Sequence, residues 1–163
     1  MRTAYSEQLA EESQRRRESG YKWDRRFLRL ADHVATWSKD PSTQVGAVIV
    51  RPDRTIASIG FNGFPRGMDD SPELLADREV KYSRTVHAEM NAILNAPAPV
   101  KGCTLYLAML PCDRCAVHVI QAGIVRVVAW EMTEDMNSRW ADSMGRTRDM
   151  LREAGVHFLE IKK

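Results

Sequence analysis

The sequence has no excess of charge of either sign. It contains 24 Lys and Arg against 22 Asp and Glu in 163 residues, a formal net charge of +2. Nucleic-acid-binding proteins draw much of their affinity from clustered basic residues that neutralise phosphates, so this balance argues against that class. It remains compatible with a small pocket for a single phosphate.

Long apolar runs are also missing. No stretch approaches the roughly 20 apolar residues that a transmembrane helix needs. The N-terminal sequence MRTAYSEQLAEESQRRRES lacks the apolar middle segment of a secretory signal. We therefore expect no membrane partner and a cytoplasmic location.

Cysteine is scarce, and its spacing is informative. The three cysteines, Cys103, Cys112 and Cys115, cannot all pair with one another. In a reducing compartment a Cys-x-x-Cys pair indicates metal binding or redox chemistry rather than a structural disulfide. Disulfide stapling is therefore not expected to hold this fold together.

The composition is typical of one globular domain, with 44% hydrophobic and 28% charged residues. Residues 1–20 are polar and highly charged, with three consecutive arginines at 15–17. We predict an N-terminal extension over 1–20, either solvated, a frayed helix or an arm on a partner subunit, and a single domain over 21–163.

Apolar periodicity and turn residues divide the domain into alternating elements. Helices are predicted at 22–39, 85–95, 112–122 and 139–154, and strands at 45–50, 55–61, 103–108, 125–130 and 156–161. The first helix is expected to stop at Asp40-Pro41, and residues 62–82 are expected to form a loop. A hairpin followed by alternating helices and strands predicts an α/β sandwich with about five strands.

Two short motifs, His87-Ala88-Glu89 and the segment Pro111–Cys115, carry the candidate chemistry. Zinc favours nitrogen and sulfur ligands in a tetrahedral array, and catalytic sites use three protein ligands and leave one position open. His87, Cys112 and Cys115 make three. The two cysteines lie three residues apart at a predicted helix start, so they share one face near the positive end of the helix, which stabilises thiolates.

Glu89 has a role only in the catalytic interpretation. Two residues after His87, it can lie beside the metal without binding it, and a carboxylate there can move protons while water replaces an amine. A closed structural zinc site would need a fourth ligand, for which Cys103 and His118 are the candidates. That alternative leaves Glu89 unused, so we favour catalysis.

Four segments, in order, resemble the deoxycytidylate deaminase family. They are DPSTQVGAVIV (Asp40–Val50), GFNGFPRG (Gly60–Gly67), KYSRTVHAEMNAIL (Lys81–Leu94) and GCTLYLAMLPCDRCAVHVIQAGIVRVV (Gly102–Val128). The two metal motifs mark the wider cytidine deaminase superfamily, and the other segments narrow the resemblance. It implies a three-layer α-β-α sandwich with a central mixed sheet of about five strands, one catalytic zinc, and hydrolysis of dCMP to dUMP and ammonia for dTMP synthesis.

The resemblance also implies substrate contacts. Asn62 would hydrogen-bond the deoxyribose and Ala88 would contact the base through its backbone. Ser42 and Thr43 would approach the phosphate, since hydroxyls and free N–H groups of a loop can cradle one. Pro111 is the remaining expected substrate-binding residue.

Assembly and regulation are implied as well. Family members are commonly hexamers, activated by dCTP and inhibited by dTTP with Mg²⁺ accompanying the nucleotide. Within the segment Gly60–Gly67, Gly60 and Gly63 also have a local interpretation as turn residues. Trp140 and Met144 are expected in the core or an interface rather than at the substrate.

Two other functions stay open. A zinc deaminase of another substrate, such as free cytidine, deoxycytidine or another aminopyrimidine, would use the same metal motifs. A non-catalytic, zinc-stabilised binding module would need the metal ligands but not Glu89.

Overall fold

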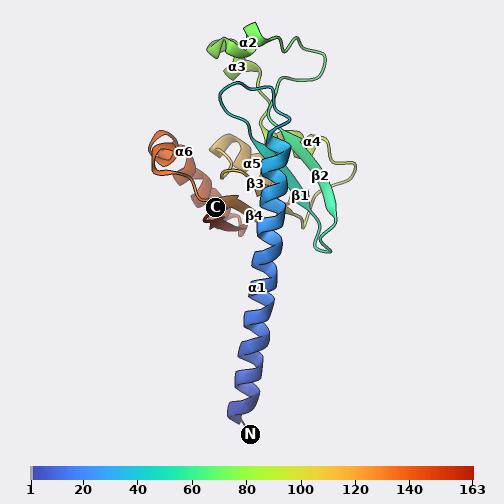
Figure 1. The fold of residues 1–163 in the computed structure, drawn as a ribbon, viewed down its shortest axis with the longest axis vertical. Coiled ribbons are helices and arrows are strands. Elements are labelled where there is room, and N and C mark those ends of the chain that lie inside the picture. The colour runs from blue at the N-terminus through green and yellow to red at the C-terminus, as the bar shows by residue number, and fades with distance from the viewer. Residues whose placement is uncertain (1) are drawn as a thin grey trace.

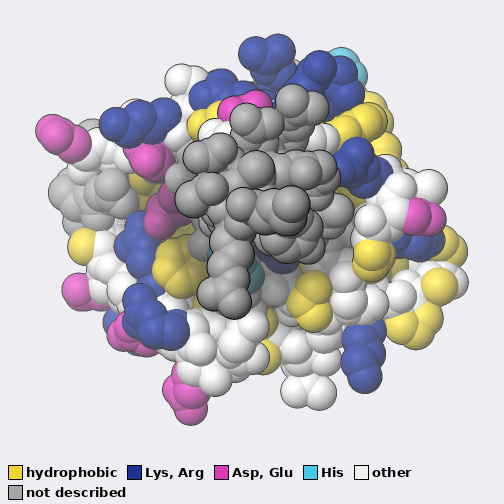
Figure 2. All heavy atoms as spheres, turned by 90° about the horizontal axis from the view of Figure 1, so that it is seen from below, with side chains coloured by type: hydrophobic (Ala, Val, Ile, Leu, Met, Phe, Trp, Pro, Cys, Tyr) yellow, Lys and Arg dark blue, Asp and Glu magenta, His cyan; other side chains and the backbone are white. Residues whose placement is uncertain are grey.

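The computed structural model describes residues 2–163, apart from the side chains of residues 2–13, 15–17 and 135–139. The side chains of the three consecutive arginines therefore lie outside the described part. No helix in the described part combines the length and apolarity needed to cross a membrane. On the face seen along the first helix, basic, acidic and apolar side chains are interspersed (Figure 2).

Five strands form one mixed sheet in the order β2-β1-β3-β4-β5. Their bounds are β1 (Gly46–Val50), β2 (Ile56–Phe61), β3 (Thr104–Leu107), β4 (Arg126–Trp130) and β5 (His157–Ile161). Strand β1 is antiparallel to both β2 and β3, whereas the pairs β3–β4 and β4–β5 are parallel. The predicted hairpin and the mixed five-stranded sheet are confirmed.

Helices cover both faces of the sheet, as Figure 1 shows. On one face α1 (Arg2–Ala35) packs against alternate strand residues such as Val48 and Val128. On the other face α4 (Ala88–Leu94), α5 (Asp113–Gln121) and α6 (Glu134–Glu153) enclose Ile49, Leu105 and Val127. Because successive strand residues point to opposite faces, each strand serves two cores. The three-layer α-β-α arrangement is confirmed.

Helix α1 is longer at one end and shorter at the other than predicted. It begins at Arg2 rather than Lys22, and its N-terminal half projects from the body (Figure 1). Residues 2–20 are rich in good helix formers but have no apolar period to reveal them. The helix ends at Ala35, and not at Asp40-Pro41, in a tight turn where Trp37 N–H bonds the carbonyl of Val34. The division at residue 20 stays a prediction.

The segment expected to be a loop contains two short helices, α2 (Pro72–Ala76) and α3 (Arg78–Arg84). Asp77 lies between them and accepts a hydrogen bond from Val80 N–H at 3.1 Å, which caps α3. Helix α6 also begins at Glu134 rather than at Arg139. Helices as short as α2 and α3 carry too little periodicity to be recognised in a sequence.

A buried ionic contact fixes α1 on the sheet. Arg126 of β4 donates two hydrogen bonds to the Asp24 carboxylate, at 2.7 and 2.8 Å, and the Tyr106 hydroxyl donates a third at 2.8 Å. Burial and the neighbouring Asp24 raise the pKa of Tyr106, which keeps its hydroxyl protonated as a donor. The charge of Asp24 is thus fully paired inside the protein.

Gly60 does not form a turn. It lies inside β2, and a Cβ there would be 2.3 Å from Ala92 N and 2.4 Å from Ala88 O. The missing side chain therefore lets α4 approach the sheet closely. A Cβ at Gly63 would meet nothing within 4 Å.

Candidate active site

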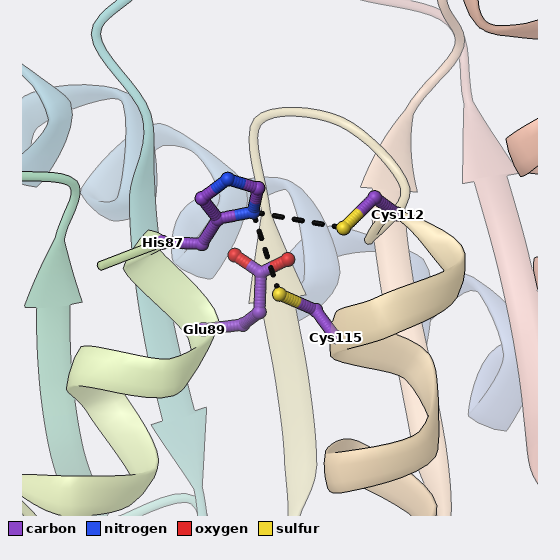
Figure 3. Close-up of side chains that lie close together, drawn as sticks. All are labelled: His87, Glu89, Cys112 and Cys115. Atoms are coloured by element: carbon purple, nitrogen blue, oxygen red, sulfur yellow. Dashed lines mark hydrogen bonds between the residues drawn. The ribbon is translucent and has the colours of Figure 1, made fainter. Parts of the chain in front are cut away.

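The two motifs meet where α4 and α5 begin. His87 is the N-cap of α4 and Glu89 lies in its first turn, while Cys112 is the N-cap of α5 and Cys115 lies in its first turn. Figure 3 shows the four side chains converging, with the Glu89 carboxylate beside the two sulfurs. The helix N-termini place partial positive charge at the cluster, which favours thiolates and a carboxylate.

The geometry fits a zinc ion. His87 Nδ1 lies 3.6 Å from Cys112 Sγ and 3.4 Å from Cys115 Sγ. Tetrahedral zinc with ordinary bond lengths separates a nitrogen ligand from a sulfur ligand by about 3.6 Å. One ligand atom from each of the four residues lies within 4.8 Å of the others. Glu89 and Cys115 are buried while His87 is exposed, so the cluster is open on one side.

The electrostatics of the cluster suit a metal that displaces protons. A hydrogen bond with Cys115 lowers the pKa of Cys112 to about 4, and His87 adds to this effect. The pKa of Cys115 is raised, because it shares its proton with Cys112 and is buried. A bound metal would replace that proton, so metal affinity should fall in acid.

Glu89 is buried, and burial disfavours the charged form of its carboxyl group. Desolvation raises the pKa of its carboxyl group, against hydrogen bonds from its own backbone N–H and from Cys115. The hydrogen bond with Cys112 raises the pKa of His87. A buried carboxyl group with a raised pKa can both accept and deliver a proton near neutral pH.

The alternative zinc ligands lie elsewhere. His118 is exposed and donates from Nδ1 to the carbonyl of Arg114 at 2.8 Å. Cys103 is a buried free thiol beside β3. Neither belongs to the cluster, and its fourth member is Glu89. The donor set is therefore the one expected for a catalytic site rather than for a closed structural one.

A pocket opens beside the cluster. It is lined by Asp40, Ser42, Thr43, Val45, Asn62, Lys81, Tyr82, Thr85, His87, Ala88, Glu89, Met109, Leu110, Cys112, Trp140 and Met144. Its polar lining comes from the loop after α1 and from α3, and much of its apolar lining from α6 and the segment before α5. The pocket thus offers both charged and apolar surfaces next to the metal ligands.

Lys81 places a cation in the polar lining. Its ammonium group contacts Asp40 Oδ1 at 3.2 Å and also the Ser42 hydroxyl, and its side chain is only 13% exposed. Asp40 Oδ1 accepts further hydrogen bonds from Ser42 N–H at 2.8 Å and Thr43 N–H at 3.0 Å. Burial alone would raise the pKa of Asp40, but these hydrogen bonds outweigh it and the pKa is lowered. These contacts use two of the three ammonium donors.

The predicted substrate residues have mixed positions. Ser42, Thr43, Asn62 and Ala88 all line the pocket. Asn62 is buried, accepts from Val45 N–H at 2.8 Å and donates to the Thr43 carbonyl at 2.9 Å, so it shapes this loop. Pro111 is not among the lining residues, and its carbonyl accepts a hydrogen bond from Thr147 at 2.9 Å.

Trp140 and Met144 line the pocket, although the sequence suggested the core or an interface. Met144 is nevertheless buried, at 2% exposure, while Trp140 is 40% exposed. In the sequence, Lys81 is distinguished only by its place in one of the resembling segments, Lys81–Leu94. For Trp140 the only signal in the sequence is its helical spacing from Met144, four residues later. Such spacing places both side chains on one face of a helix but does not show whether that face meets the core or a pocket.

Comparisons with known proteins agree with the geometry. Residues 21–131, which include both motifs, match the model of the cytidine and deoxycytidylate deaminase zinc-binding region. An uncharacterized deaminase from the luxG 3' region of Aliivibrio fischeri is 49% identical over 135 residues, covering 83% of this chain and 90% of that protein. The deoxycytidylate deaminase of Mus musculus is 39% identical over 160 residues, covering 92% and 85%.

A solved structure shows the same fold. The dCMP deaminase of cyanophage S-TIM5, in complex with dCMP and dUMP, superposes with a TM-score of 0.65 over 84% of this chain and 95% of that chain. The sequence identity is 21%. At this identity the likeness supports the fold, and the assignment of chemistry depends on the side chains of this chain.

Proposed function

The chain belongs to the cytidine and deoxycytidylate deaminase family, and we propose that it hydrolyses dCMP to dUMP and ammonia, supplying dUMP for dTMP synthesis. The observation that carries the proposal is that candidate metal ligands and a cationic side chain line the same pocket. It joins the cluster of His87, Cys112, Cys115 and buried Glu89 to a lining that contains Lys81 and Ser42. A deaminating centre beside a cation and hydroxyls suits an aminopyrimidine that carries a phosphate.

In this mechanism His87, Cys112 and Cys115 hold zinc, and Glu89 moves protons. A bound zinc ion supplies Lewis-acid chemistry that lowers the pKa of water to about 7. Glu89 would take one proton from the attacking water and deliver it to the ring nitrogen N3. It would then take the second proton, from the hydroxyl that the attack leaves on C4, and deliver it to the amine, so that the C4–N bond breaks and ammonia leaves. Its burial suits this role, because a raised carboxyl pKa lets it carry a proton at neutral pH.

The rest of the pocket would orient the substrate. Ser42, Thr43 and Lys81 bind the phosphate, and Asn62 contacts the deoxyribose. The Ala88 backbone contacts the base. Pro111 does not line the pocket, so it would influence the position of the substrate indirectly, through the backbone that leads to Cys112. Trp140 and Met144 would face the base or sugar from α6.

The direct test is a substrate panel with zinc-loaded protein. Ammonia release, or the ultraviolet change on loss of the amine, would be followed with dCMP, CMP, deoxycytidine and dCTP. Turnover confined to dCMP supports the proposal. Equal turnover of deoxycytidine would leave the zinc chemistry but discard the phosphate pocket. No turnover with zinc bound would favour another amine substrate or the binding module.

Lys81→Met is expected to lower kcat/KM for dCMP by about 10- to 100-fold, because a charge-assisted bond to the phosphate is lost. Deoxycytidine has no phosphate, so its turnover should change little. Steady-state kinetics on both substrates measure the difference. Lys39→Met is the matched control, since Lys39 pairs with Asp70 at the surface and does not line the pocket. An equal fall for both substrates would contradict phosphate binding by Lys81.

Trp140→Ala is expected to raise KM for dCMP and deoxycytidine by the same factor, about 5- to 100-fold, with kcat little changed. Contact between an aromatic ring and a base contributes about 1–3 kcal/mol and is made in both ground and transition states. Trp37→Ala is the control, because Trp37 is 48% exposed and lies outside the pocket lining. An unchanged KM in Trp140→Ala would exclude the ring from substrate binding.

Regulation, assembly, organisation and location are proposed from the resemblance and the sequence. The protein would form hexamers, respond to dCTP and dTTP with Mg²⁺, carry residues 1–20 as an extension of a domain over 21–163, and reside in the cytoplasm. Repeating the substrate panel with and without dCTP and Mg²⁺ tests the first effector, and sedimentation of the purified protein tests the assembly.

A further inference from the structure

Helix α6 contacts the segment that carries two of the proposed zinc ligands. We call residues 111–115 the zinc-binding turn. Ser143 accepts a hydrogen bond from Asp113 N–H at 3.1 Å and donates one to the Asp113 carboxylate at 3.0 Å. One turn further along α6, Thr147 donates to the carbonyl of Pro111 at 2.9 Å. The backbone of Cys112 lies between these two bonded groups.

These contacts satisfy two backbone groups, the Asp113 N–H and the Pro111 carbonyl, which make no hydrogen bond to another backbone group in the described part of the chain. The first N–H groups of a helix lack intrahelical acceptors, and Asp113 is the first residue of α5. Cys112, the N-cap, makes no side-chain capping bond, and its sulfur faces His87 instead. Pro111 is buried and Thr147 is completely buried, so the bond between them is shielded from water.

We propose that Ser143 and Thr147 are positioning residues for the zinc ligands: they hold the backbone on both sides of Cys112 so that Cys112 and Cys115 face His87. The inference rests on the proposed function for the identity of the ion. Groups that orient metal ligands commonly contribute 10- to 100-fold to metal affinity. The hydrogen bonds of Ser143 and Thr147 go to Asp113 and to the Pro111 carbonyl, and not to a proposed zinc ligand.

Ser143 and Thr147 lie outside the part of the chain that the family model matches. The family match ends at residue 131, so α6 lies wholly beyond the matched region. The same helix supplies Trp140 and Met144 to the pocket lining. One element outside the shared motifs therefore both supports the zinc-binding turn and lines the pocket.

The test is zinc affinity, measured by competition between the full-length protein and a chromophoric chelator. Thr147→Val keeps the side-chain shape and removes only the donor, and Ser143→Ala removes the other contact. Each variant is expected to bind zinc about 10- to 100-fold more weakly than the unmodified protein. Cobalt-substituted protein should also show a shifted visible absorption band, because the ligand geometry changes. Wild-type affinity and spectrum in both variants would overturn the proposal.

Two controls separate positioning from general loosening of α6. Arg148→Met removes the ion pair of α6 with Glu160 of β5, at 2.9 Å, and should leave zinc affinity unchanged. An equal loss in Arg148→Met would overturn the proposal. Thr147→Ser keeps the hydroxyl, so its zinc affinity should equal that of the unmodified protein. If Thr147→Val does not fold, Ser143→Ala still tests the proposal, because Ser143 is only partly buried. Because zinc affinity is measured without substrate, failure of the deaminase proposal would be seen separately.

Discussion

Glu89→Gln is expected to lower the turnover of dCMP by about 10²- to 10⁴-fold while zinc binding and the fold remain. Glutamine has the shape of glutamate but cannot carry a proton between water, the ring nitrogen and the leaving amine. The carboxyl group is only 4% exposed, and burial disfavours its charged form. A neutral amide avoids that desolvation, so stability should be unchanged or higher. Single-turnover kinetics, zinc content by atomic absorption and thermal unfolding measure the three properties.

The control is Glu131→Gln, which changes an exposed carboxyl group after β4 and should turn over dCMP normally. Near-normal turnover in Glu89→Gln with zinc bound would contradict proton transfer by Glu89. Loss of zinc together with activity would assign Glu89 to the metal instead. That outcome would mean that Glu89 closes the metal site as a fourth ligand, which contradicts its proposed role in proton transfer.

The metal ligands could be predicted because their geometry is largely local. Cys112 and Cys115 share the first turn of one helix, and His87 and Glu89 flank the start of another. Helical geometry therefore fixes each pair from spacing alone. The strand order is also constrained by local signals, since the hairpin and the alternation of helices and strands leave few topologies.

Contacts between distant segments could not be predicted. Lys81 meets Asp40 across 41 residues, and Arg126 meets Asp24 across 102. Neither pair has a local pattern, so the contact of Lys81 with Asp40 in the pocket and the ionic contact of α1 with the sheet could be seen only in the structure. Trp140 shows the same limit, because helical spacing identifies a buried face but not what lies against it.

Gly60→Ala is expected to destabilise the protein by about 3 kcal/mol, because overpacking against backbone cannot be relieved by a side-chain rotation. The added Cβ would lie 2.3 Å from Ala92 N and 2.4 Å from Ala88 O. Helix α4 must move away from β2, and it carries His87 and Glu89 at its start. Zinc affinity and turnover should therefore fall together with stability. Urea unfolding, chelator competition and dCMP kinetics on the same preparation test this.

Gly63→Ala is the matched control, only three residues away. A Cβ at Gly63 meets nothing within 4 Å, and the hydrogen bonds of this residue with Val86, at 3.1 and 2.8 Å, involve only backbone. It should therefore retain stability, zinc and activity. Equal stability of Gly60→Ala and Gly63→Ala would contradict the close approach of α4 to β2. Loss of stability in Gly60→Ala without any loss of zinc affinity would show that the metal ligands tolerate movement of α4.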